Sequence, residues 1–208
     1  MGKNKIPFTE SRSYPVFFMI LITVIFIGIL ATFHQITRQR IENHRILSYK
    51  KTVLSLFDLP FTNIEADYND FIEENNQNGM DYLTARKENQ IIGYGFNISG
   101  SGLWGSIHMI IAVTPDFQEI IKLDILDQNE TPGLGGRITE SWFKDQFSGK
   151  DFVEQGKIIP FKLVPEEDDI DLKEIRQITG ASSSSKAVVK ILYLELQNIA
   201  DKLGIKYD

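Results

Sequence analysis

Apolar residues are concentrated near the start of the chain, where residues 14–33 read YPVFFMILITVIFIGILATF without a single charge. A helix rises about 1.5 Å per residue, so this stretch is about 30 Å long, which matches the hydrocarbon thickness of a bilayer. A buried core helix is the alternative, but the rest of the chain would have to cover every face of a uniformly apolar rod. The pattern therefore predicts a transmembrane helix over residues 14–33.

A cleavable secretory signal is another interpretation of this segment. Lys3, Lys5 and Arg12 would supply its basic start, but the apolar run exceeds the usual ~7–15 residues and no small-x-small site follows it. We therefore expect an uncleaved anchor, preceded by a cytoplasmic segment over residues 1–13. Basic residues also follow the anchor, at positions 38, 40, 45, 50 and 51, so the positive-inside rule gives no clear orientation.

Beyond the anchor, large apolar residues recur at mixed three- and four-residue steps over residues 34–58, which predicts a continuing helix. Pro60 breaks a helix, so we assign residues 34–60 to a helical stalk and 61–208 to a domain. Two interpretations of the stalk stay open: its basic residues meet anionic headgroups, or it is a plain spacer. The acidic, asparagine-rich stretch 65–79 is typical of a solvated surface segment.

Short runs of alternating residues follow, and each predicts a strand. They cover residues 91–98, 107–113, 120–126 and 158–164. Residues 138–147 predict a short helix, and Ser185 to Leu203 an amphipathic helix with Gly204 as its C-cap. The expected fold class is α+β, with an N-terminal transmembrane helix, a mainly antiparallel sheet and a C-terminal helix.

Charge and composition exclude several classes of function. The net charge of the 208 residues is −6, which argues against nucleic acid as a partner because phosphate binding needs a basic surface. Cysteine is absent, which excludes disulfides, thiolate metal sites, iron–sulfur clusters and cysteine nucleophiles. His34 and His44 follow the anchor closely, so a metal centre or catalytic triad would depend on His108 alone. Redox chemistry would therefore need an organic cofactor.

Three segments differ from ordinary scaffold. Residues 100–105 (GSGLWG) predict a glycine-rich turn presenting a tryptophan, although a tight turn with a packed tryptophan explains the same pattern. Residues 130–137 (ETPGLGGR) predict a loop able to pass close to a ligand, without the Gly-Lys-Ser/Thr ending of a Walker loop. Residues 178–186 (ITGASSSSK) precede the last helix, where hydroxyls, amides and the helix dipole favour a phosphate. A serine-rich helix cap is the alternative, but it accounts for one serine better than for four.

Together these segments resemble the FMN-binding subunits of the sodium-pumping NADH:quinone reductase (Nqr) and of the related Rnf-type electron-transport complex. The resemblance includes the anchor, the Gly-Leu-Trp-Gly turn at 102–105 and the Glu-Thr-Pro-Gly-Leu-Gly-Gly loop at 130–136. It ends with a Ser/Thr-Gly-Ala-Ser/Thr-x-Ser/Thr-Ser signature over residues 179–185. It implies an FMN-binding domain that carries electrons in an ion-translocating membrane complex.

In that family the FMN phosphate is esterified to the second Ser/Thr of the signature, which is Ser182 here. The resemblance also implies a set of residues that line the flavin ring, and these are Leu103, Trp104, Thr131 and Leu134. It assigns Lys186 to offset the phosphate charge. The other candidate cofactor-binding residues are Thr179, Gly180, Ala181, Ser184, Ser185, Glu130 and Gly135.

The implied partners are other membrane subunits of an Rnf/Nqr-type complex, a flavin transferase and the lipid bilayer. The resemblance places the domain on the outer (periplasmic) face of the cytoplasmic membrane. The chain departs from the family at Arg176, where an aspartate is usual, and Glu174 lies two positions earlier.

This departure motivates an alternative function, that of a flavin-free assembly subunit. A free-standing membrane-anchored FMN-binding protein is a further alternative. An independent hydrolase has no credible nucleophile–base pair in this sequence.

Overall fold

The computed structural model of the chain describes residues 14–206. Residues 1–13, for which a cytoplasmic location is predicted, lie outside the described residues. The chain divides into two compact units, Met1–Leu47 and Ser48–Asp208. Helix α1 (Tyr14–Leu56) contains the whole predicted anchor. It is long and apolar enough to cross a membrane, and its apolar window is not buried in protein.

Helix α1 ends through a left-handed residue rather than at Pro60. Asp58 adopts a φ of 50°, and the amide of Leu59 donates to the carbonyl of Leu54 at 3.0 Å. A second hydrogen bond of 3.4 Å runs from the amide of Asp58 to the carbonyl of Ser55, and the two bonds together form a Schellman motif. The helix predicted over residues 34–58 is therefore confirmed as far as Leu56. It stops there because its last carbonyls are satisfied by the turn.

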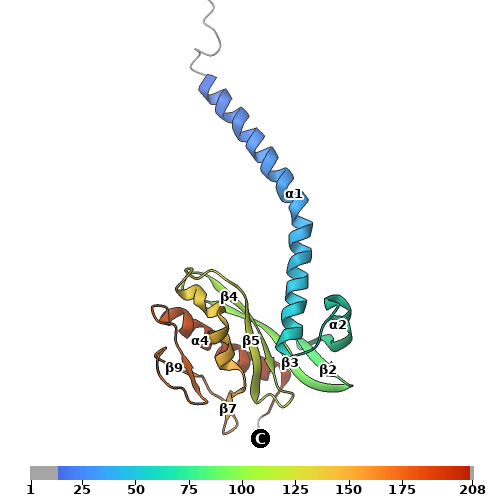
Figure 1. Ribbon diagram of the computed structural model, residues 1–208, viewed down its shortest axis with the longest axis vertical. Coiled ribbons are helices and arrows are strands. Elements are labelled where there is room, and N and C mark those ends of the chain that lie inside the picture. The colour runs from blue at the N-terminus through green and yellow to red at the C-terminus, as the bar shows by residue number, and fades with distance from the viewer. Residues whose placement is uncertain (1–13, 207–208) are drawn as a thin grey trace, which may run out of the picture. The chain divides into compact units, whose positions relative to one another are not determined.

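The second unit is built on a six-stranded antiparallel sheet whose strands follow one another in chain order (Figure 1). The strands are β1 (Ile72–Gln77), β2 (Met80–Lys87), β3 (Gln90–Ser101), β4 (Ser106–Val113), β5 (Glu119–Gln128) and β6 (Lys150–Asp151). The strands predicted over 91–98, 107–113 and 120–126 are confirmed as parts of β3, β4 and β5.

The acidic stretch 65–79 forms regular structure that its composition does not indicate. Helix α2 (Ile64–Phe71) is capped by Asn63, whose side chain accepts a hydrogen bond from the amide of Ala66 at 3.2 Å. Strand β1 follows directly and pairs with β2 along its whole length. Most side chains of the stretch are exposed, as expected for a solvated surface.

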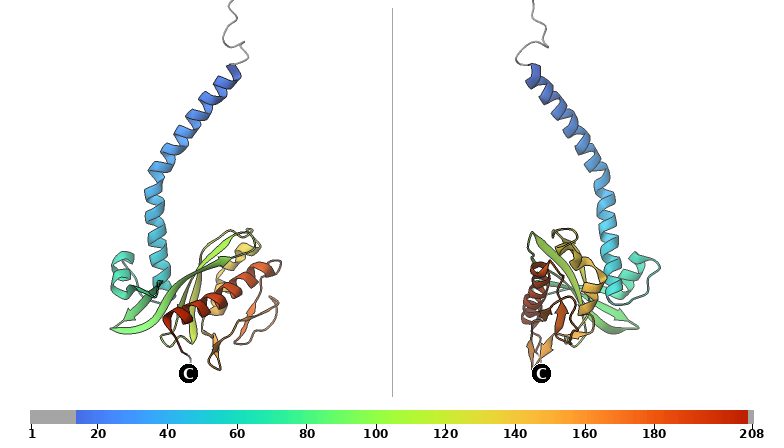
Figure 2. Two further views of the ribbon diagram at one scale, coloured as in Figure 1. Left: turned by 180° about the vertical axis from the view of Figure 1, so that it is seen from behind. Right: turned by 60° about the vertical axis from the view of Figure 1, so that its left-hand side comes forward.

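Alternate residues of β4 point to opposite faces of the sheet, and both faces are covered. Met109 and Ile111 belong to a core shared with helix α4 (Ser182–Leu203), which lies across one face (Figure 2). Ile110 belongs to a second core, together with Val53 and Leu54 from the last turns of α1. These turns are thus part of the folded domain, whereas the sequence predicts the domain to start at residue 61. That boundary remains a prediction.

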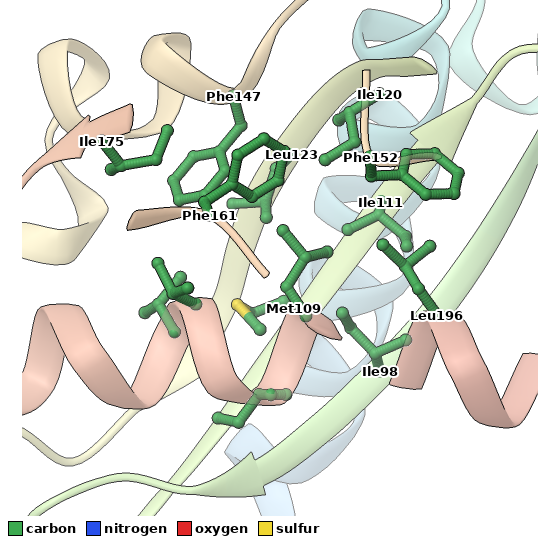
Figure 3. Packing of buried hydrophobic residues seen from close by; sticks show 14 of the residues in the cluster. Ile98, Met109, Ile111, Ile120, Leu123, Phe147, Phe152, Phe161, Ile175 and Leu196 are labelled. Atoms are coloured by element: carbon green, nitrogen blue, oxygen red, sulfur yellow. The ribbon is translucent and has the colours of Figure 1, made fainter. Parts of the chain in front are cut away.

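The larger core is completed by aromatic residues that come after β5 in the chain (Figure 3). Phe147, Phe152 and Phe161 are all buried. The rings of Phe147 and Phe161 meet edge to face, with centroids 5.9 Å apart. Leu196 of α4 packs into the same cluster. The segment that leads to α4 is therefore fixed to the sheet by large apolar side chains.

The segment between β5 and α4 consists of short pieces. Apart from β6, they are η2 (Gly135–Thr139), α3 (Ser141–Lys144), η3 (Asp145–Phe147), β7 (Val153–Glu154), β8 (Lys157–Ile158), β9 (Lys162–Val164) and β10 (Glu174–Arg176). The single helix predicted over 138–147 is thus divided into three turns. The single strand predicted over 158–164 is wrong, because Pro160 cannot donate to a ladder and separates β8 from β9.

Helix α4 confirms the predicted C-terminal helix, although it starts at Ser182 rather than Ser185. Gly204 follows it in the left-handed conformation, with a φ of 68°. The amide of Ile205 donates to the carbonyl of Ala200 at 2.9 Å, as in a Schellman motif. The glycine C-cap predicted from the sequence is therefore confirmed.

Candidate functional site

A buried carboxylate joins the three segments that the sequence singles out. Glu130 is only 4% exposed, and its Oε1 accepts hydrogen bonds from the amides of Leu103 at 2.7 Å and Trp104 at 3.1 Å. Its Oε2 accepts a hydrogen bond from Ser184 Oγ at 2.6 Å. One side chain therefore holds together the tip of the β3–β4 hairpin, the 130–137 loop and the first turn of α4.

Two glycines allow these segments to meet. A Cβ atom at Gly102 would overlap Glu130 Oε1. A Cβ atom at Gly135 would overlap Ser184 Oγ and lie 2.8 Å from Glu130 Oε2. The glycines at these two positions are therefore explained by close packing around the carboxylate. Glu130 and Gly135, both candidate cofactor-binding residues, are buried, and their observed role is to hold the three segments together.

The turn over residues 131–134 presents Leu134 to solvent. The Leu134 amide donates to the carbonyl of Thr131 at 3.1 Å, with Pro132 and Gly133 between them. Gly133 has a φ of +73°, as the third residue of a type II turn requires. Leu134 also lies against the signature, because its Cδ2 is 3.4 Å from the place where a Cβ of Gly180 would be. The loop and the signature thus form one continuous surface.

The four serines at the start of α4 divide into two buried and two exposed residues. Ser184 donates to Glu130, as described. Ser185 Oγ accepts a hydrogen bond from the amide of Ile178 at 3.0 Å and donates to the carbonyl of Ala181 at 3.3 Å. Ser182 and Ser183 are exposed, and neither hydroxyl bonds to another described residue. These two hydroxyls are therefore available for chemistry.

The N-terminus of α4 also suits an anion. Ala181 occupies the N-cap position and offers no side-chain hydrogen bond to the first turn, so the amides of that turn remain open. The turn before it is closed by a 2.9 Å bond from the Ala181 amide to the carbonyl of Ile178, with Gly180 at a φ of +77°. Lys186 is exposed one turn into the helix. A phosphate on Ser182 would meet open amides, the positive end of the helix dipole and an ammonium group.

A glutamate that no sequence motif includes holds the signature in place. Glu166 Oε2 accepts a hydrogen bond from the amide of Thr179 at 2.6 Å, and Oε1 accepts one from Arg137 at 3.1 Å. The hydrogen bonds from Thr179, followed by that from Arg137, lower the pKa of Glu166 from 4.5 to about 2. Because Arg137 ends the 130–137 loop, this contact ties the loop to the signature. Glu166 opens a run of similar acidic residues, so no local sequence signal distinguishes it.

Arg176 occupies the position where the resembled family usually has an aspartate. Its amide donates to Gln146 Oε1 at 2.8 Å, and its Nε donates to the carbonyl of Asp168 at 2.6 Å. Its guanidinium also lies 3.9 Å from the carboxylate of Asp169. These contacts all stabilise the segment before the signature. They leave the Ser182 hydroxyl uncovered.

Apolar side chains and a groove lie close to the signature. Leu103, Trp104 and Leu134 are 57%, 72% and 47% exposed, so all three present apolar surface to solvent. A groove of about 520 Å³ includes Ser182, Ser183 and Lys186 in its lining. The site therefore combines a free hydroxyl, an open helix N-terminus, a cation and apolar surface. This combination fits a cofactor with a phosphate and an aromatic ring system.

Comparison with known proteins identifies that cofactor. Residues 102–194 match the model of the FMN-binding domain family, and this match supports FMN as the cofactor. The matched residues include the hairpin tip, the 130–137 loop and the signature. The three motifs that carry the predicted resemblance therefore lie inside the matched region.

The chain is homologous to subunits of two related complexes. It is 37% identical over 123 residues to a subunit of the proton-translocating ferredoxin:NAD(+) oxidoreductase complex of Clostridium ljungdahlii, covering 59% of this chain and 62% of that protein. It is 46% identical over 55 residues to a subunit of the Na(+)-translocating NADH-quinone reductase of Chlamydia pneumoniae, covering 26% of this chain and 17% of that protein. The matched part thus spans less than two thirds of the length of either relative.

A solved structure shares the fold. The corresponding subunit of the Na(+)-translocating NADH-quinone reductase from Parabacteroides distasonis superposes with a TM-score of 0.64 at 24% identity. The superposition covers 76% of this chain and 92% of that chain. The predicted α+β fold, with a long apolar helix, an antiparallel sheet and a C-terminal helix, is therefore confirmed.

Proposed function

We propose that this chain is a membrane-anchored electron-carrier subunit of an ion-translocating complex of the Rnf or Nqr type, with FMN esterified to Ser182. The observation that carries the proposal is the difference in hydrogen bonding among the four serines at the start of α4, in a region that matches the FMN-binding domain. Two of its four hydroxyls are bound within the protein, and Ser182 is exposed at an open helix N-terminus. The relatives named above are subunits of such complexes, which supports membership in one.

The attachment requires an activated flavin and an enzyme that delivers it. In a transfer from a flavin dinucleotide, a bond forms between Ser182 Oγ and the flavin phosphorus while the pyrophosphate bond breaks. The nucleoside monophosphate leaves, and the serine proton is lost to a base. Among the described residues, no hydrogen bond joins Ser182 Oγ to a histidine or carboxylate. The general base that accepts the serine proton is therefore expected on the enzyme that delivers the flavin. A flavin transferase is therefore part of the proposal.

The protein's own part in electron transfer is to bind and position the cofactor. FMN supplies reversible electron uptake when it is bound. The first turn of α4 and Lys186 hold the phosphate, and the exposed Leu103, Trp104 and Leu134 offer apolar contacts to the ring. Thr131 lies at the base of the turn that carries Leu134. Glu130 and Glu166 keep these surfaces together.

We further propose that α1 anchors the chain in the cytoplasmic membrane with the domain on its outer face. The length and apolar character of α1 support the anchor. Protease added to spheroplasts should cleave the domain, and protease added to inverted vesicles should leave it intact. The reverse pattern would contradict the proposed orientation.

The attachment site is tested by expressing the full chain with a flavin transferase and separating it on a denaturing gel. We expect a fluorescent band for the wild type and for Ser182→Thr, which keeps a hydroxyl. Ser182→Ala should give a folded but dark chain, because it has no acceptor atom. Ser183→Ala is the matched control, since Ser183 is also exposed, and it should remain fluorescent. Mass analysis of the fluorescent peptide locates the ester.

A flavin-free assembly subunit is the second candidate function, and it is motivated by Arg176, which stands where the resembled family usually has an aspartate. A dark wild-type band would support it, provided that a family member with covalent flavin fluoresces in the same cells. Arg176→Asp should then restore fluorescence. In that case the chain would still have to purify with the other subunits of a complex.

A further inference from the structure

The groove next to Ser182 follows one stripe of helix α4. Its helical wall consists of residues one turn apart on the same face: Ser182, Ser183, Lys186, Val189, Lys190 and Tyr193. The opposite wall comes from the segment around β8 and β9 and includes Pro160, Phe161 and Leu163. The groove therefore extends along α4 for about three turns from Ser182. It contains none of the four residues proposed above to line the flavin ring.

The lining of this groove suits an aromatic molecule with negative charge. Its volume of about 520 Å³ lies within the range of about 300–1,000 Å³ that is usual for small-molecule sites. Phe161 and Val189 supply apolar wall, and Tyr193 supplies an aromatic ring. Neither Lys186 nor Lys190 forms an ion pair with another described residue. Two uncompensated cations thus stand along an apolar groove that begins at the acceptor hydroxyl.

We propose that this groove is a second docking surface for the isoalloxazine ring of an FMN esterified to Ser182. The inference rests on the covalent attachment proposed above. A tether on Ser182 keeps the ring at high local concentration near any surface within reach. Tyr193 lies about 16 Å along the helix from Ser182, a span comparable with an extended phosphate, ribityl chain and tricyclic ring. Lys186 would then lie near the phosphate and Lys190 nearer to the ring.

The two docking surfaces differ in their construction. Leu103, Trp104 and Leu134 are all exposed side chains at the hairpin tip and in the 130–137 loop. The groove instead has one wall on α4 and another on the segment around β8 and β9. The chain thus offers its cofactor two different surfaces, both reached from the same serine.

Fluorescence lifetimes of the flavinylated full chain test this inference. Tyrosine or tryptophan in contact with an excited flavin donates an electron to it and shortens its lifetime, whereas phenylalanine does not. We expect two quenched components in the wild type. Tyr193→Phe should remove the component that belongs to the groove. Trp104→Phe is the matched control at the other surface, and it should leave the groove component unchanged.

Lys190→Gln gives a second measurement that does not depend on quenching. A cation next to the ring favours the more negative, reduced state, so its loss should move the flavin midpoint potential to a lower value. Lys202→Gln is the control, because Lys202 lies on α4 outside the groove lining and should leave the potential unchanged.

The outcomes separate this inference from the proposed function. Unchanged lifetimes in Tyr193→Phe, on a chain that carries covalent flavin, would overturn the inference alone and leave the groove to a protein partner. A potential unaffected by Lys190→Gln would have the same meaning. A wild-type chain without covalent flavin would overturn the proposed attachment and the inference together.

Discussion

Ser184 Oγ donates a 2.6 Å hydrogen bond to Glu130 Oε2 in the interior of the FMN-binding domain. Both residues are almost fully buried, at 1% and 4% exposure. The other oxygen of Glu130 is occupied by the two amides at the hairpin tip. Removing one partner would therefore leave polar groups buried without a bond, which costs more than the bond itself contributes.

Glu130→Ala should destabilise the domain by roughly 2–4 kcal/mol, because three donors lose their acceptor at once. Ser184→Ala should cost about 1.5–3 kcal/mol, since only one bond to a charged group is lost. Urea unfolding of the two single variants and of the double variant gives the coupling energy. Additive effects would contradict a direct interaction between the two side chains.

Gly135→Ala should cost about 1–3 kcal/mol, because the new Cβ overlaps Ser184 Oγ and crowds Glu130. Gly136→Ala is the matched control. A Cβ there comes no closer than 3.4 Å to the atoms around it and the residue lies in a helical turn, so the change should be near neutral. Thermal unfolding of the two variants measures the difference. Equal stabilities would show that the loop relaxes away from α4.

The signature should lose its anchoring in acid. Glu166 has its pKa lowered from 4.5 to about 2, so its contribution to stability is present above pH 4.5 and is lost as the pH falls towards 2. Hydrogen exchange of the Thr179 amide, corrected for its intrinsic pH dependence, should therefore lose protection across this window. In Glu166→Gln the protection should be lower at neutral pH and nearly independent of pH. A wild-type amide with constant protection between pH 5 and about 2 would refute this assignment.

Trp104→Ala should change the flavin without weakening the protein. The side chain is 72% exposed, so its loss should alter the free energy of unfolding by no more than about 0.5 kcal/mol. If it contacts the ring, the absorption spectrum and midpoint potential of the flavinylated chain should shift. An unchanged spectrum and potential, together with the same result for Leu134→Ala, would remove both residues from the ring site.

A chain that starts at Ser48 should fold in solution, whereas one that starts at Phe61 should not. The shorter chain lacks a set of buried residues from the end of α1 and the turn after it: Val53, Leu54, Leu56, Phe57 and Leu59. Burial of one such side chain contributes about 1.5–3 kcal/mol, and a whole domain is stable by only about 5–15 kcal/mol. Circular dichroism melting curves compare the two chains. A cooperative transition in the shorter chain would support the boundary predicted at residue 61.

The elements that could be predicted from the sequence are those whose pattern is local. Helix α4 has an apolar stripe and a glycine C-cap, and the central strands have alternating or continuous apolar runs. Strand β1 has no such pattern, because its six residues carry almost no apolar side chains and its pairing with β2 is made by the backbone. The start of α4 is predicted too late because a serine run favours caps and turns over helix interiors.

The candidate site is predictable as a set of segments and not as a set of contacts. The three motifs indicate which parts of the chain carry the cofactor. They do not indicate that Glu130 bonds to Ser184, because that pair is separated by 54 positions and depends on the tertiary fold. Nor do they distinguish the free hydroxyl of Ser182 from the bound hydroxyls of Ser184 and Ser185, which have the same chemistry in the sequence.

The packing around Glu130 has a consequence for how such a domain can change. Gly102, Glu130, Gly135 and Ser184 come from three separate stretches of the chain, and all of them pack around the Glu130 carboxylate. A chimaera that takes its hairpin from one relative and its last helix from another would lose stability unless all four residues still match. A substitution at one of these positions requires compensating substitutions at the others. We therefore expect the four positions to vary together among related domains, even where the surrounding surface residues vary independently.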